Sequence, residues 1–174
     1  MIKLIVKIFF IFVLTISFLH AHSNKKKSLK SHEHGVGTLN IAQDENTIIF
    51  EFEIPGSDIV GFEYLAKEEE DIKKVKDAID ILSDYKNMIL PSGAGKCKLL
   101  NSSAKVINEG KHSEFLSNYK FNCENLAELK IIYIRYFKNF ENGRKLNIKI
   151  FGENKKSAYV ISKTKKIINI KGHF

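Results

Sequence analysis

The stretch TLNIAQDENTIIFEFEIPG, residues 38–56, decides the fold, because it shows the two-residue period of a β-strand twice in succession. The apolar residues at every second position are Leu39, Ile41, Ile48, Phe50, Phe52 and Ile54. The polar segment QDEN, residues 43–46, separates the two halves and predicts a hairpin turn. Pro55 and Gly56 end the second strand, and residues 57–64 are predicted to form a turn or a short capped coil.

A single long helix is predicted downstream, from Lys67 to Met88. Apolar residues recur there at steps of three and four, which is the spacing of one helix face. After Pro91, segments rich in Ile, Phe, Tyr and Val predict further strands. These are residues 96–100, 105–108, 115–123, 128–134, 145–151, 158–161 and 167–170, and residues 135–140 could form a short helical turn.

The order of these elements favours an α+β fold, a mainly antiparallel sheet with one long helix packed on a face. The chain is 44% hydrophobic and 28% charged, which supplies a core and excludes a disordered chain. We assign residues 1–21 to a signal peptide, residues 22–34 to a flexible basic arm with histidines, and residues 35–174 to a single domain.

Residues 1–21 have the pattern of a secretory signal peptide. Lys3 and Lys7 precede an uncharged apolar run, residues 8–19, and the small residue Ala21 follows. The run is shorter than the roughly 20 residues that a spanning helix needs. We therefore expect cleavage near Ala21 and no stable membrane insertion afterwards; the alternative is an uncleaved anchor.

The formal net charge is +8, and it falls to +6 without residues 1–21. Basic clusters at residues 25–30 and 155–166 could meet anionic lipid, polysaccharide or nucleic acid. Lysine far outnumbers arginine and occurs along the whole chain, which favours a role in solubility. We expect no nucleic-acid partner.

Cys97 and Cys123 are the only cysteines. In the oxidising compartment that a signal peptide implies, we expect them to form a disulfide. The alternatives are a thiolate metal site and a redox pair. The chain has no C-x-x-C motif, which favours the disulfide.

Two groups of residues could bind a metal ion. His32 and His34 are two residues apart, so in an extended segment both imidazoles point to the same side and can chelate one ion. His112 and Glu114 have the same spacing in front of an apolar strand. Exposed histidines that bind nothing are the alternative, and His173, beside the C-terminus, is interpreted as a solvated residue.

Motifs of enzymes are missing from the sequence. It has no G-x-S-x-G, H-E-x-x-H, P-loop or G-x-G-x-x-G pattern, and no nucleophile can be tied to a base by spacing. The segment GAGK, residues 93–96, is interpreted as a turn before a strand. We predict that the protein is not an enzyme.

Three segments carry a family resemblance. They are HEHGVGTLNIA at residues 32–42, IPGSDIVGFE at residues 54–63 and HSEFLSNYKFNC at residues 112–123. Together they resemble the ZrgA-like periplasmic zinc-uptake proteins, formerly a domain of unknown function. The resemblance covers nearly all of residues 32–170.

The resemblance implies a non-catalytic periplasmic protein of a Gram-negative bacterium that binds zinc and assists its uptake. Its partners would be the zinc ion and an ABC-type zinc transporter or the periplasmic binding component of that transporter. The ligands it implies are His32, His34, His112 and Glu114. Asp58 and Glu63 also match the family pattern, and a helix cap or a strand-end hydrogen bond explains them equally well.

One departure from the family limits the expected capacity. Relatives carry a tract rich in His, Asp and Glu before the Y-x-F-x-C strand, whereas residues 101–112 here contain one histidine. We therefore expect about one zinc site. The alternative function is a metal-independent envelope binding module that uses a basic surface.

Overall fold

The structure is a computed structural model that describes residues 33–174. The predicted signal peptide and nearly all of the predicted arm, including His22 and His32, lie outside the described residues. Among the residues from 33 onward, no helix is long and apolar enough to cross a membrane.

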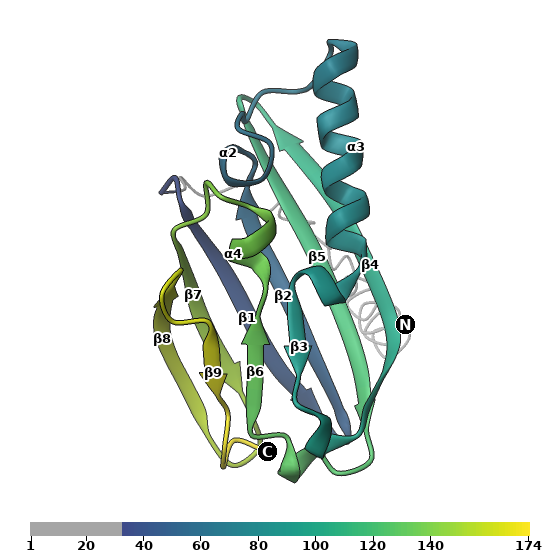
Figure 1. Cartoon of the computed structure of the whole chain (residues 1–174), viewed down its shortest axis with the longest axis vertical. Helices are drawn as coiled ribbons and strands as arrows, with labels where there is room; N and C mark the ends of the chain where they lie inside the picture. Colours follow the sequence, from purple (N-terminus) through teal and green to yellow (C-terminus); the bar gives the residue numbers. More distant parts are fainter. Residues whose placement is uncertain (1–32) are drawn as a thin grey trace, which may run out of the picture.

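The described residues form two sheets that share one core (Figure 1). The six-stranded sheet has the order β4-β5-β2-β1-β7-β8, and the three-stranded sheet has the order β3-β6-β9. The strands are β1 (Val36–Asp44), β2 (Thr47–Pro55), β3 (Ile89–Pro91), β4 (Cys97–Glu109), β5 (His112–Cys123), β6 (Ile131–Ile134), β7 (Lys145–Phe151), β8 (Lys156–Ser162) and β9 (Ile167–Asn169). The helices are α2 (Gly56–Ile59), α3 (Glu69–Ser83) and α4 (Tyr136–Asn139), with 3-10 turns at Tyr85–Asn87, Gly93–Gly95 and Leu126–Glu128.

The predicted hairpin at residues 38–56 is confirmed. β1 and β2 pair antiparallel, with Leu39 opposite Phe52 and Ile41 opposite Phe50. All six alternating apolar residues of the stretch are buried, so its two-residue period marks the face that the core covers. Thr47 closes the turn by donating a hydrogen bond from its hydroxyl to the carbonyl of Asp44.

The prediction of an α+β fold with one long helix packed on a sheet face is wrong, because the described chain is mostly β. α3 fully buries only Ala78 and Leu82, and Ile72 in its first half is 51% exposed. The inner face of the six-stranded sheet is instead covered by the three-stranded sheet, whose Ile132 and Ile168 belong to the same core (Figure 1). A helix is present over Glu69–Ser83, shorter than the predicted Lys67 to Met88, and it lies against β4 and the neighbouring β5 at one edge of the sheet.

Details of the strands also differ from the prediction. The two strands predicted at residues 96–100 and 105–108 are one strand, β4, with an irregular register between Leu99 and Asn101. β3 was not predicted, because its three residues lie between the predicted end of the helix at Met88 and the first strand predicted after Pro91. β1 pairs with β7 in parallel, so the large sheet is mixed. The strand predicted at residues 145–151 and the helical turn within residues 135–140 are confirmed.

The disulfide between Cys97 and Cys123 is confirmed. The two cysteines face each other at one end of the β4–β5 hairpin, and Glu109 and His112 face each other at the other end. The covalent link therefore fixes the end of the hairpin opposite to the predicted histidine ligand.

Candidate metal centre

His34 is held in place through its backbone. The guanidinium of Arg144 donates a hydrogen bond to the carbonyl of His34. The next residue, Gly35, donates its N–H to Asp58 Oδ1 at 2.7 Å and accepts from the amides of Arg144 and Lys145. These bonds connect the start of β1 to α2 and to the start of β7. They therefore hold the backbone from which the His34 side chain extends.

Gly35 is required at this position for two reasons. Its φ of +85° is one that other residues rarely adopt, and a Cβ there would lie 2.2 Å from Nε of Arg144. The glycine of the H-x-H-G segment is thus explained by the close approach of Arg144, which in turn binds the carbonyl of His34.

Glu63 lies in the loop after α2, between two aromatic residues. The rings of Phe62 and Tyr64, which flank Glu63 in the chain, stack on each other with centroids 4.5 Å apart. Ser57 donates a hydrogen bond from its hydroxyl to Glu63 Oε1 at 3.1 Å. This loop therefore presents a single, oriented carboxylate.

Both described histidines of the prediction contact this carboxylate. Nε2 of His34 lies 3.3 Å from Glu63 Oε1, and Nδ1 of His112 lies 2.8 Å from Glu63 Oε2. The Glu63 side chain is 12% exposed, whereas the His34 and His112 side chains are 70% and 55% exposed. A sheltered carboxylate with two imidazoles open to solvent is accessible to an incoming ion.

The carboxyl group of Glu63 is held in its ionised form. Burial acts to raise its pKa, but the hydrogen bonds from His112 and Ser57, together with the charge of His34, outweigh burial and lower the pKa of Glu63 below its ordinary value. An ionised carboxylate beside two imidazoles is a donor set that zinc accepts.

Asp58 forms a second, buried carboxylate behind this site. It is 2% exposed, and its Oδ2 has no hydrogen-bond partner among the described residues. Burial raises the pKa of Asp58 above its ordinary value, against the hydrogen bond from Gly35. Its clearest role is to position Gly35, and through it His34.

The other predicted ligands lie as follows. Glu114 is nearly buried in β5, two residues after His112, with Pro55 of β2 opposite it in the register. His32 lies outside the described residues. Within residues 33–174, no group of three or more His, Cys, Asp or Glu side chains is already arranged to hold a metal ion.

Sequence reasoning left Glu63 out of the ligand set, although both histidines contact it. The sequence signal that could have indicated Glu63 is the segment GFEY, residues 61–64. One acidic residue there stands between two aromatic residues and follows a glycine, whose φ in the structure is +88°.

The interpretation of His173 as solvated is wrong. His173 is buried, and its ring nitrogens lie 2.8 Å from Ser157 Oγ and 3.0 Å from the carbonyl of Ile170, which is a structural role.

Comparisons with known proteins agree with the earlier resemblance. No curated protein matches the chain. The sequence model for the ZrgA family zinc uptake protein matches residues 31–170, which include all the residues of the candidate centre. The chain therefore belongs to the ZrgA family of zinc uptake proteins.

Proposed function

We propose that the protein is a periplasmic zinc-binding protein that assists zinc uptake without catalysing a reaction. The observation that carries the proposal is the contact of His34 and His112 with the one carboxylate of Glu63. Imidazole nitrogen and carboxylate oxygen are ligands that zinc prefers. We propose Glu63 as a ligand beside the predicted His32, His34 and His112, and Glu114 as an acidic neighbour of His112 in β5.

Two distances at Glu63 can be compared with the spacing of zinc ligands. Zinc takes such ligands at about 2.0 to 2.2 Å in a tetrahedron, so two ligand atoms stand about 3.3 Å apart. The 3.3 Å between His34 Nε2 and Glu63 Oε1 has this value, and the 2.8 Å between His112 Nδ1 and Glu63 Oε2 needs a shift of about half an ångström. The two imidazoles contact different oxygens of Glu63, so one bound ion would have to bring both nitrogens to the same point.

A fourth ligand is supplied in this proposal by His32. It precedes His34 by two residues in the chain. His34 itself lies in a turn, which the N–H of Val36 closes by donating a hydrogen bond to the carbonyl of Glu33, so the extended backbone expected for the H-x-H pair is not present at His34. Four protein ligands would give a closed tetrahedral site for one ion. Glu114 would then act behind His112, on the same side of β5, as the predicted acidic partner.

The ligand types determine how zinc binding depends on pH in this proposal. Imidazole binds metal only in its neutral form, whereas the pKa of Glu63 already lies below its ordinary value. Zinc affinity should therefore fall as the pH drops through about 6.5, the ordinary range of imidazole.

The location and partners are part of the same proposal. The pattern of residues 1–21 supports export, and membership of a zinc uptake family supports action beside a zinc transporter of the ABC type or its periplasmic binding component. The protein would deliver or retain zinc at that transporter.

Calorimetric titration of zinc into the protein without residues 1–21 tests the proposal. His34→Ala and His112→Ala should each weaken binding at least about tenfold. Lys111→Ala, next to His112 and exposed, should leave the affinity unchanged. Equal affinity in all variants, or no heat with the unaltered protein, would contradict the proposal.

A further inference from the structure

Positive charge is concentrated in the last part of the chain. Residues 154–174 contain six lysines and no Asp or Glu, whereas residues 33–153 contain sixteen basic and twenty acidic residues. The six are Lys155, Lys156, Lys163, Lys165, Lys166 and Lys171. The domain thus has an acidic main part and a basic C-terminal part.

The basic part lies along one side of the molecule. β8 is an edge strand of the six-stranded sheet, β9 is an edge strand of the three-stranded sheet, and the two lie side by side in yellow in Figure 1. The turn of residues 163–166 joins them. Both sheets therefore end here with a strand that has a neighbour on one side only.

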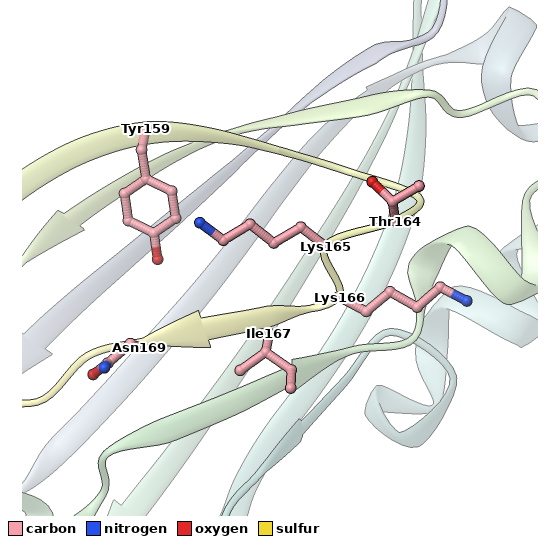
Figure 2. A pocket seen from close by; sticks show the side chains of 6 residues that line it. All are labelled: Tyr159, Thr164, Lys165, Lys166, Ile167 and Asn169. Atoms are coloured by element: carbon pink, nitrogen blue, oxygen red, sulfur yellow. The ribbon is translucent and has the colours of Figure 1, made fainter.

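A cavity of about 530 Å³ lies between these edges. It is lined by Tyr159, Thr164, Lys165, Lys166, Ile167 and Asn169 (Figure 2). The ammonium group of Lys165 reaches back over the ring of Tyr159, 5.9 Å from its centroid, while Lys166 extends the opposite way from the same turn (Figure 2). The amine of Lys165 thus points toward Tyr159, and that of Lys166 points away from it.

Several groups around the cavity lack a partner. In the described part of the chain, no carboxylate lies within ion-pair distance of Lys165 or Lys166, and the hydroxyl of Tyr159 has no hydrogen-bond partner. Val160 and Ile167 are 54% and 47% exposed. The cavity side therefore has cations without a carboxylate partner and the exposed Ile167, whereas Val160 is exposed on the opposite face of β8.

The free edge of β8 supplies a fourth feature. The strand pairs with β7, and among the described residues its other edge joins no further strand. An edge strand presents unpaired N–H and C=O groups, to which an extended segment can add by main-chain hydrogen bonds. Lysines around such an edge repel other basic chains and attract acidic ones.

We propose that this side of the molecule binds an extended acidic segment of a partner protein. The segment adds to the free edge of β8, and its carboxylates contact Lys165 and Lys166. Its apolar side chains, which alternate with the carboxylates, lie on the other face of the strand, over Val160. This surface comes from β8 and β9, whereas the candidate metal centre comes from the loop after α2 and the starts of β1 and β5, so the two can be tested separately.

The experiment uses a fluorescent synthetic peptide in which Glu alternates with Val. Anisotropy should show saturable binding that weakens as salt is raised. Lys165→Glu/Lys166→Glu should weaken it by about tenfold. The matched control Lys67→Glu/Lys76→Glu reverses two exposed lysines elsewhere, with the same change in net charge, and should leave binding unchanged.

Amide hydrogen exchange separates strand addition from simple charge attraction. Bound peptide should slow exchange of amides within residues 158–162, and inorganic polyphosphate should not. Equal weakening by both double variants, or peptide binding without slower exchange in β8, would overturn the proposal. Loss of zinc binding in His34→Ala should leave peptide affinity unchanged.

Discussion

Nδ1 of His112 lies 2.8 Å from Oε2 of Glu63, although the two residues are 49 positions apart in the chain. His112 opens β5 after a tight turn, and Glu63 is carried by the loop that follows β2, the neighbour of β5 in the sheet. The pairing of β2 with β5 therefore brings the two side chains together. The same loop offers its second carboxylate oxygen to His34.

Glu63→Gln should weaken zinc binding by about tenfold or more, because it removes the negative charge between the two imidazoles while keeping the shape of the side chain. Zinc competition with a chromophoric chelator measures the change. Glu141→Gln, an exposed residue, is the control and should bind zinc as the unaltered protein does. Unchanged affinity in Glu63→Gln would remove Glu63 from the ligand set.

Gly35→Ala should destabilise the fold by about 1 to 3 kcal/mol, because the new Cβ meets Arg144 and the φ of +85° is unfavourable for alanine. Zinc affinity should fall as well, since Gly35 fixes the backbone of His34. Urea unfolding measures the first effect and calorimetry the second. Gly93→Ala has free space around the added Cβ and should change neither quantity by more than about 0.5 kcal/mol.

Asp58 and Glu63 should give opposite slopes of stability against pH. The pKa of Asp58 is raised in the folded state, so its proton favours folding, and this contribution is lost as the pH rises above 3.8, the ordinary value. The pKa of Glu63 is lowered, so its contribution is present above its ordinary value of 4.5 and is lost as the pH falls.

Urea unfolding between pH 3 and pH 7 measures both slopes. Asp58→Asn keeps an oxygen that can accept from Gly35 and removes the buried charge, so stability should rise more steeply with pH than in the unaltered protein. The stability of Glu63→Gln should rise less steeply with pH than that of the unaltered protein. Identical profiles in all three proteins would show that neither carboxyl group has a different pKa in the folded and unfolded states.

Replacing both cysteines by serine should lower stability by about 3 to 4 kcal/mol, the value that chain entropy gives for a closed loop of this length. Zinc affinity at temperatures where the variant is folded should stay the same, because the disulfide lies at the end of the β4–β5 hairpin away from His112. A large loss of zinc affinity in the folded variant would place the site nearer to the disulfide.

The sequence predicted the elements whose pattern is local. The β1–β2 hairpin has a complete two-residue period and polar turn residues, and β7 alternates from Lys145 to Phe151, so both could be predicted. The second sheet could be predicted only in part. Strands were predicted at residues 128–134 and 167–170, where β6 and β9 lie, but the three residues of β3 were not, and no local pattern shows that these strands pair with one another. Without that sheet, the long helix was the only element left to cover the inner face.

The residues of the candidate site also divide into those that local motifs predict and those that depend on long-range pairing. His34 and His112 were identified because their motifs are visible in the chain, and Glu63 was passed over because its importance depends on the pairing of β2 with β5. The basic surface was interpreted as scattered lysine, since its lysines gather on one side only once β8 and β9 lie together. The importance of Glu63 and the gathering of the lysines both depend on strands that are far apart in the chain, and no local sequence pattern encodes that pairing.

The most direct test is nitrogen NMR of the imidazole rings during zinc titration of the protein without residues 1–21. If the account is right, Nε2 of His34 and Nδ1 of His112 shift together and the shifts are complete at about one equivalent of zinc. If zinc binds without changing either nitrogen, or does not bind at all, the centre at Glu63 is not a zinc site.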